Sequence, residues 1–177
     1  MTASSTNNSI RILSIKYGTS VDGIGLRTSL YCAGCENHCP GCHNPQSWNE
    51  DGGEAISVDE LYTRIVDADM NVTFTGGDPM FHPEGFIALA SLIKRNTNKT
   101  IWCYTGYTFE KILENPRQKQ LLQHIDILVD GRFIESLKDE SLYFRGSSNQ
   151  RLIDVQASLA QNKTIIYEYE PKADIHI

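Results

Sequence analysis

The amino-acid sequence predicts an α/β fold built on a mainly parallel β-sheet, either an open sheet or a partial barrel. The first observation is that strand-like and helix-like segments alternate from about residue 50 to residue 130, a pattern typical of βα units. The second is length, because roughly four to six such units are too few for a closed eight-stranded barrel in 177 residues. The third is composition, since 40% apolar and 21% charged residues indicate a globular chain.

The chain begins with a polar segment followed by a strand. Residues 1–9 predict a disordered lead-in, so we expect one domain over residues 10–177. Residues 10–17 alternate apolar and polar side chains, which predicts a strand. After a glycine-bearing turn, the apolar residues 27–34 lead into a group of cysteines. Residues 49–55 predict a polar loop.

Two helices follow, and each has a start signal. Ser57 and Glu60 form a capping box, and apolar residues recur behind them at helical spacing. Residues 71–75 predict a short strand that ends at the motif "GGDP". Pro83 then opens the second helix, whose apolar residues share one face.

The second half of the chain continues the alternation. Residues 100–104 predict a strand, Thr108 can cap a short helical piece, and Pro116 interrupts the helical pattern. Residues 125–130 predict a further buried strand. Beyond them the pattern loosens until residues 164–169, which predict the last strand.

Four polar or glycine-bearing loops come directly after apolar segments. They are the cysteine loop "CENHCPGC" (residues 35–42) and the motifs "GGDP", "TGY" and "DGR". In a parallel sheet such loops gather at the carboxyl ends of the strands, which is where ligands bind. We therefore expect these four loops to face one another.

Net charge and cysteine content indicate which classes of partner and which cellular compartment to expect. A formal net charge of −6 argues against nucleic acid or an anionic membrane as the main partner. No apolar run approaches the roughly 20 residues that span a bilayer, and the first ten residues lack the apolar stretch of a secretory signal. We therefore expect a cytoplasmic protein, in which clustered cysteines bind metal more often than they form disulfides. The odd number of cysteines, five, also fits a disulfide framework poorly.

The cysteines allow three interpretations. The first interpretation is that a cysteine is a small residue of the apolar core. This interpretation fits Cys103, which lies in an apolar strand, but it does not fit Cys35, Cys39 and Cys42, which have polar surroundings. The second interpretation is structural zinc, which usually takes four ligands arranged as two separated pairs. The fourth ligand here would be Cys32, which lies in a predicted strand. An iron–sulfur cluster is the third, since closely spaced thiolates can bind several of its corners. Three thiolates would leave one iron without a protein ligand.

The spacing C-x3-C-x2-C of Cys35, Cys39 and Cys42, followed about 35 residues later by "TGGDP" at residues 75–79, resembles the signature of the radical S-adenosylmethionine enzymes. The resemblance implies a particular α/β fold, an open partial (β/α) barrel of about five to six parallel strands. One radical S-adenosylmethionine domain would then occupy residues 10–177. The resemblance also implies that the three thiolates hold a 4Fe-4S cluster and that S-adenosylmethionine chelates the fourth iron.

Further segments resemble one group within this family, the glycyl-radical activating enzymes. "DGIGLRTSLYCAGC" is similar to their glycine-rich approach to the cluster, and "CPGCHNPQSW", "WCYTGY", "ILVDGRF" and "FRGSSNQRLID" are similar to segments of those that activate anaerobic ribonucleotide reductase. The resemblance implies an enzyme that reductively cleaves S-adenosylmethionine and forms a glycyl radical on the large subunit of that reductase, with a flavodoxin-like electron donor. The alternatives are an activator of another glycyl-radical enzyme, of the pyruvate formate-lyase type, or a non-catalytic zinc-binding module.

The same resemblance implies a set of residues that bind the cofactors. The two glycines of "GGDP" would let the backbone approach the methionine part of S-adenosylmethionine, and the aspartate of that motif would turn the backbone or face the ammonium group. The residues that flank the last cysteine would contact the adenine. If the histidine there were instead a ligand of the cluster, it would occupy the open coordination site that S-adenosylmethionine needs. The predicted cofactor-binding residues are Gly41, Cys42, His43, Gly76, Gly77, Asp78 and Asp130, and the predicted metal ligands are Cys35, Cys39 and Cys42.

Overall fold

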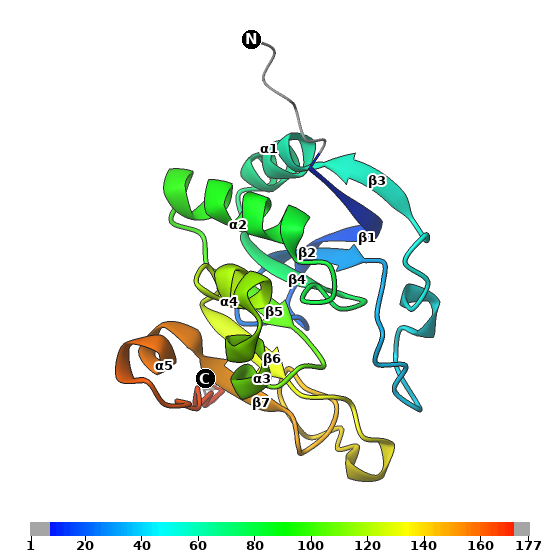
Figure 1. The fold of residues 1–177 in the computed structure, drawn as a ribbon, viewed down its shortest axis with the longest axis vertical. Helices are drawn as coiled ribbons and strands as arrows, with labels where there is room; N and C mark the ends of the chain where they lie inside the picture. The colour runs from blue at the N-terminus through cyan, green and yellow to red at the C-terminus, as the bar shows by residue number, and fades with distance from the viewer. Residues whose placement is uncertain (1–7, 172–177) are drawn as a thin grey trace, which may run out of the picture.

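The computed structural model describes residues 8–171, which contain seven strands, five α-helices and two short 3-10 helices (Figure 1). All seven strands belong to one sheet, in the order β3-β1-β2-β4-β5-β6-β7. The strands are β1 (Ser9–Thr19), β2 (Arg27–Cys32), β3 (Glu54–Ser57), β4 (Asn71–Gly76), β5 (Ile101–Tyr104), β6 (Ile127–Asp130) and β7 (Arg151–Asp154).

The sheet is mixed and does not close, so the predicted open partial (β/α) barrel of about five to six parallel strands is wrong. Strands β2, β4, β5 and β6 run parallel. Strand β1 pairs antiparallel with β2 and β3, and β7 pairs antiparallel with β6. The short link from β1 to β2 makes these neighbours antiparallel, because parallel neighbours need a longer crossover. The loop between β6 and β7 is long enough for either direction, so its length does not decide how β7 runs. Side-chain periodicity carries no information about direction.

The helices begin where the sequence predicts for α1, α2 and α3. The Ser57 hydroxyl accepts a hydrogen bond from the backbone N–H of Glu60 (3.2 Å), and the Thr108 hydroxyl caps α3 in the same way. Such caps satisfy backbone donors that have no partner within the helix. The α-helices are α1 (Val58–Ala68), α2 (Glu84–Asn96), α3 (Phe109–Glu114), α4 (Pro116–Leu122) and α5 (Val155–Gln161), and the 3-10 helices are Pro45–Ser47 and Glu135–Leu137.

The two faces of the sheet differ. One face carries the main core, which includes Phe74 of β4 and Cys103 of β5, both fully buried, so Cys103 is a core residue as predicted. Helices α1, α2 and α3 contribute Leu61, Phe86 and Ile112 to this core. Because successive side chains of a strand point to opposite faces, Trp102 and Val129 belong to a smaller apolar cluster on the other face. That second face bears the cavity described below.

The structure differs from the sequence-based prediction near several loops. Strand β3 begins inside the predicted polar loop 49–55, and β7 and α5 were not predicted. The strand predicted over residues 164–169 is wrong, because this segment forms only one isolated bridge, between Ile166 and Ile153. Alternating side chains therefore reflect a segment with one face against the protein, and they do not guarantee a ladder of backbone hydrogen bonds.

The predicted lead-in, residues 1–9, lies mostly outside the described residues, and β1 already begins at Ser9. The single domain predicted over residues 10–177 also extends beyond them at its carboxyl end. Among the helices of the described chain, none is long and apolar enough to cross a membrane.

A buried arginine joins the parallel strands at their amino ends. Arg27, at the start of β2, is 1% exposed. Its Nε donates to the Thr73 hydroxyl (2.7 Å), and Nη2 donates to the carbonyl oxygens of Val72 (2.6 Å) and Thr100 (3.1 Å). Its Nη1 donates to the carbonyl oxygen of Ile24, in the turn before β2 (3.0 Å). Burial lowers the pKa of Arg27 to about 10, so it stays charged at neutral pH.

Replacing this guanidinium should destabilise the sheet. We expect Arg27→Met to lower the free energy of unfolding by about 2–4 kcal/mol, because the side chain fits but the carbonyl oxygens lose their donors. Equilibrium unfolding in urea measures the change. The matched control is Arg95→Met at the exposed end of α2, which we expect to change stability by less than about 0.5 kcal/mol. Equal losses in both variants would contradict this role of Arg27.

Candidate iron–sulfur and cofactor site

Four loops meet at the carboxyl ends of β2, β4, β5 and β6, which confirms the expectation that they face one another. Asn37 of the cysteine loop donates from Nδ2 to Oδ2 of Asp78 in "GGDP" (3.0 Å). Arg132 of "DGR" donates from Nη2 to the carbonyl oxygen of Asn37 (2.6 Å), 95 positions away in the sequence. Gly131 donates from its backbone N to the carbonyl oxygen of Tyr107 in "TGY" (3.2 Å).

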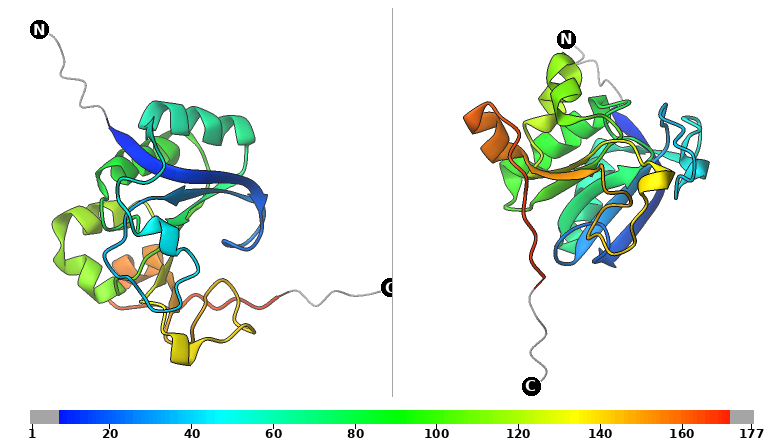
Figure 2. Two further views of the ribbon diagram at one scale, coloured as in Figure 1. Left: turned by 90° about the vertical axis from the view of Figure 1, so that its right-hand side faces the viewer. Right: turned by 90° about the horizontal axis from the view of Figure 1, so that it is seen from below.

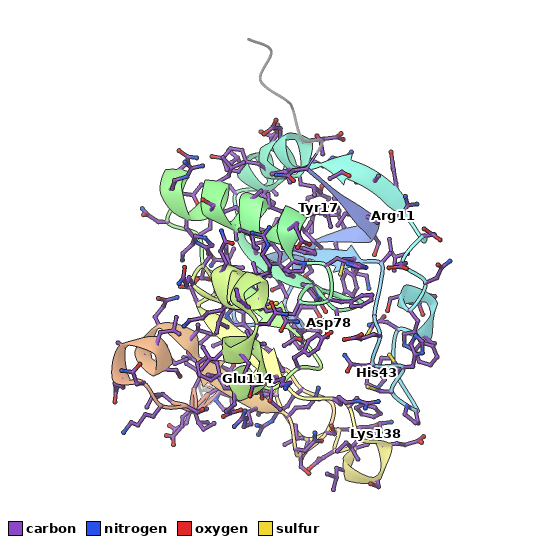
Figure 3. The ribbon with its side chains drawn as sticks, viewed as in Figure 1. Arg11, Tyr17, His43, Asp78, Glu114 and Lys138 are labelled. Carbon is purple, nitrogen blue, oxygen red and sulfur yellow. The ribbon has the colours of Figure 1, made fainter. Side chains whose placement is uncertain are left out.

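The carboxylate of Asp78 is the centre of this arrangement, and Figure 3 shows it near the middle of the molecule. Asp78 is 2% exposed. Its Oδ1 accepts from the Thr105 hydroxyl (2.8 Å) and from the backbone N of Met80 (3.0 Å), while Oδ2 accepts from Asn37 and from the backbone N of Gly106 (2.9 Å). Burial raises the pKa of Asp78 to about 6, although these donors favour the ionised form.

The two glycines before Asp78 allow the backbone of "GGDP" to pack directly against the start of the cysteine loop. Gly77 donates from its N to the carbonyl oxygen of Cys32 (2.7 Å), and Asp78 donates from its N to that of Gly34 (2.8 Å). A Cβ on Gly77 would lie 2.4 Å from the Gly34 carbonyl oxygen, and Gly76 has a φ of 95°, which favours glycine. Within the protein, these glycines are therefore required by the contact between the two loops.

The three cysteines of the cysteine loop are free thiols with different exposures. Cys39 is buried, whereas Cys35 and Cys42 are half-buried. Asn37 Nδ2 lies 3.8 Å from Cys35 Sγ, and the backbone N of Asn44 donates to Cys42 Sγ (3.3 Å). Burial raises the pKa of the Cys35 thiol above its ordinary value.

Cys32 differs from these three cysteines. It ends β2, is 2% exposed and belongs to the main apolar core. Burial raises the pKa of its thiol well above the ordinary value. The structure therefore places Cys32 with Cys103 in the core, apart from the thiols of the loop.

A cavity of about 1030 Å³ opens on the sheet face opposite the main core. Cys39, Cys42 and His43 line one side of it. Side chains from the strands, including Tyr31 and Thr75, line it as well. The remaining lining residues include many from the loop between β6 and β7. Of the predicted cofactor-binding residues, Cys42 and His43 line this cavity, while Gly41, Gly76, Gly77, Asp78 and Asp130 do not.

The flanks of the last cysteine contact the segment that follows β6. Gly41 has a φ of 73°, and a Cβ there would lie 3.0 Å from the Glu135 side chain. The His43 ring packs against Phe133 with the ring centroids 5.3 Å apart. The cysteine loop is thus held by the GGDP motif on one side and by this segment on the other.

Asp130 is a buried residue outside the cavity, and it forms an ion pair with the partly exposed Arg151. Its carboxylate accepts from Arg151 Nε (3.0 Å) and Nη2 (2.6 Å) and from the backbone N of Phe109, the first residue of α3 (2.8 Å). Arg151 also pairs with Glu110. Arg151 was not among the predicted site residues, and its one signal in the sequence is its position as the last residue of the "RGSSNQR" segment.

The thiols of the cysteine loop suit an iron–sulfur cluster. A cluster distributes its protein ligands over separate iron atoms, and its usual protein ligands are thiolates. The three thiols share one loop, and two of them line the cavity. This donor set suits a cluster that is reached from the cavity.

Comparison with known proteins defines the class first. Residues 21–153 match the family described as "4Fe-4S single cluster domain", and this stretch contains all four meeting loops, the cysteine loop among them. The protein is therefore an iron–sulfur protein that holds a 4Fe-4S cluster.

Curated relatives identify the family more narrowly. A protein from Salmonella typhi is 37% identical over 142 residues, which cover 73% of this chain and 89% of the relative. The protein from Escherichia coli strain K12 is 36% identical over 140 residues, with the same coverage, and that from Enterobacteria phage T4 is 37% identical over 139 residues, covering 75% and 86%. Each is named anaerobic ribonucleoside-triphosphate reductase-activating protein. The chain belongs to this family of activating proteins.

Changing Asp78 should loosen the cysteine loop. We expect Asp78→Asn to lower the free energy of unfolding by about 2–4 kcal/mol, because the amide NH₂ would face groups that are themselves donors. Urea unfolding of the cluster-free protein measures this, and iron bound after anaerobic reconstitution should also fall. Asp59→Asn, on the exposed face of α1, is the matched control and should change neither. Unchanged iron binding in Asp78→Asn would contradict a role of Asp78 in holding the loop.

The pairing of Glu110 with Arg151 should make stability depend on pH under acid conditions. Hydrogen bonds from Arg151 lower the pKa of Glu110 to about 2, from an ordinary value of 4.5. Between these values the unfolded chain binds more protons, so this contribution is complete above about pH 4.5 and is lost as the pH falls toward 2. We expect Glu110→Gln to reduce the loss of stability over this range, measured by urea unfolding at several pH values. Glu114→Gln, on the same helix but paired with Lys111, should retain the wild-type dependence.

Proposed function

We propose that this protein activates an anaerobic ribonucleoside-triphosphate reductase by generating a glycyl radical on it. The observation that carries the proposal is the cysteine loop at the cavity, in a chain that belongs to a family of such activators. When bound, a reduced cluster with S-adenosylmethionine would supply a 5′-deoxyadenosyl radical that takes a hydrogen atom from a glycine Cα. A flavodoxin-like protein would supply the electron, in the cytoplasm.

Cys35, Cys39 and Cys42 are the proposed cluster ligands. Their position on one loop, with Cys39 and Cys42 at the cavity wall, supports this assignment. The hydrogen bonds from Asn37 and from the Asn44 backbone to cysteine sulfur would stabilise the thiolates, and such bonds also tune the potential of a cluster.

The cavity is the proposed place for S-adenosylmethionine. Cys42 and His43 line it, and Gly41 gives the loop its turn next to them. Gly76, Gly77 and Asp78 would act by holding the loop in place, since their backbone and side-chain groups bond to it directly. The role proposed for Asp130 is indirect as well, because Arg151 and the start of α3 occupy its carboxylate.

Anaerobic reconstitution with iron and sulfide tests the proposal. We expect a brown protein that, once reduced, cleaves S-adenosylmethionine to 5′-deoxyadenosine and methionine and forms a glycyl radical on the reductase, seen by electron paramagnetic resonance. Alanine at Cys35, Cys39 or Cys42 should abolish the intact cluster and both activities.

Cys32→Ala and Cys103→Ala are the matched controls, since both cysteines lie in the core. They should keep the cluster and the cleavage activity even if they lower stability. A colourless protein with one bound zinc ion would refute the proposal. So would a protein that cleaves S-adenosylmethionine but transfers a radical only to another glycyl-radical enzyme.

A further inference from the structure

The loop between β6 and β7, residues 131–150, supplies a large part of the cavity wall. Leu142, Tyr143, Phe144 and Arg145 all line the cavity. Apart from the 3-10 helix Glu135–Leu137, the loop has no helix or strand. Ordering a long loop costs conformational entropy, so contacts within the loop and contacts with the rest of the protein both fix its conformation. The contacts that hold this wall in place are therefore important for the shape of the site.

Phe144 has a backbone conformation that needs such support. Its φ is 60°, in the left-handed region that a bulky residue other than glycine rarely adopts. A residue in this region persists only when its surroundings hold it there, and such residues often occur at functional sites. Phe144 combines this conformation with a position in the cavity wall.

Two aromatic side chains from outside the loop hold Phe144. Trp102 of β5 packs edge-on against it, with ring centroids 5.2 Å apart. Tyr169, near the carboxyl end of the described chain, packs edge-on from 5.0 Å and also contacts Tyr143 from 5.2 Å. Edge-to-face contacts at these separations are favourable beyond the area that they bury.

The segment that carries Tyr169 is anchored to the sheet. Residues 163–171, which we name the C-terminal strap, continue from α5 past β7 (Figure 2, red). The backbone N of Tyr167 donates to the Leu152 carbonyl oxygen (2.8 Å), and that of Asp154 donates to the Ile165 carbonyl oxygen (3.0 Å). The strap lies beyond residue 153, where the match to the 4Fe-4S family ends.

The strap has one face against the protein and one toward solvent. Tyr167 and Tyr169 are half-buried, whereas Ile166, Glu168 and Glu170 are exposed. This alternation is typical of an extended segment that packs along one side. It also offers matched positions for mutation, one residue apart on opposite faces.

We propose that the C-terminal strap positions one wall of the cavity, with Tyr169 holding Phe144 and Tyr143 in place, and that this wall receives the polypeptide of the protein substrate. The second part rests on the proposed function, since a protein substrate must enter the cavity to reach the cysteine loop. Tyr143, 51% exposed, is an aromatic side chain of that wall which an entering polypeptide can contact. Tyr169 is thus a positioning residue that acts through its neighbours.

Hydrogen exchange measured by mass spectrometry tests the strap in the cluster-free protein. In Tyr169→Ala we expect peptides covering residues 139–148 to exchange about tenfold faster, because two aromatic pairs are lost. Tyr169→Phe keeps the ring and should exchange as the wild type does. Glu168→Ala, on the opposite face of the strap, should also leave the exchange of these peptides at the wild-type rate. Unchanged exchange in Tyr169→Ala would overturn the proposed strap, whatever the protein's activity.

Kinetics with the reconstituted protein test the second part. We expect Tyr169→Ala to raise the KM for the reductase about tenfold while leaving kcat and the cleavage of S-adenosylmethionine without reductase near the wild-type values. Tyr169→Phe should restore the wild-type KM. Faster loop exchange with an unchanged KM would overturn the role of the wall in receiving the substrate. If the wild type fails to form a glycyl radical on the reductase, the proposed function and the substrate-receiving role of the wall are both refuted. The hydrogen-exchange result would still show whether the strap positions the wall.

Discussion

The buried carboxylate of Asp78 is the interaction on which the site depends. It accepts hydrogen bonds from the cysteine loop, from its own turn and from the turn after β5, so one side chain fixes three loops that come from different strands. The glycines before it allow the backbone of the same turn to contact the start of the cysteine loop directly. Because a buried carboxylate is costly unless its acceptors are satisfied, these loops can take few other arrangements. The GGDP turn thus holds the cysteine loop in place, and the same loop borders the cavity.

The division of the sheet into two faces explains why the cavity lies where it does. Helices cover one face and bury the main core, whereas the second face carries a smaller cluster around Trp102 and leaves room for the cavity. The same tryptophan supports two features of the site. Its ring contacts the Arg27 guanidinium and also packs against Phe144 of the cavity wall. The core of the second face and the wall of the cavity are therefore parts of one packed unit.

Local signals in the sequence predicted local structure well. The caps at Ser57 and Thr108 and the cysteine spacing all depend on residues close together in the chain. The expectation that loops after the central strands would meet is also confirmed, since β2, β4, β5 and β6 are parallel. The predicted barrel was wrong because strand direction and order at the two edges depend on connections and packing, which periodicity does not encode. The strand predicted over residues 164–169 was wrong for a similar reason: its alternating side chains record contact with the loop and with β7.

By itself, the sequence determined the chemistry of the site. Three thiols on one polar loop, a glycine-rich turn after the next apolar strand and the resemblance of several segments to an activator family were sufficient to predict a 4Fe-4S cluster and its context. Only the tertiary structure decided which partners each residue has. In the folded protein, Asp78 bonds to the neighbouring loops and Asp130 pairs with Arg151. Cys32 lies in the core, and Tyr169 packs against the cavity wall. These contacts join residues that are distant in sequence, and they follow from how the sheet brings its loops together rather than from any local pattern.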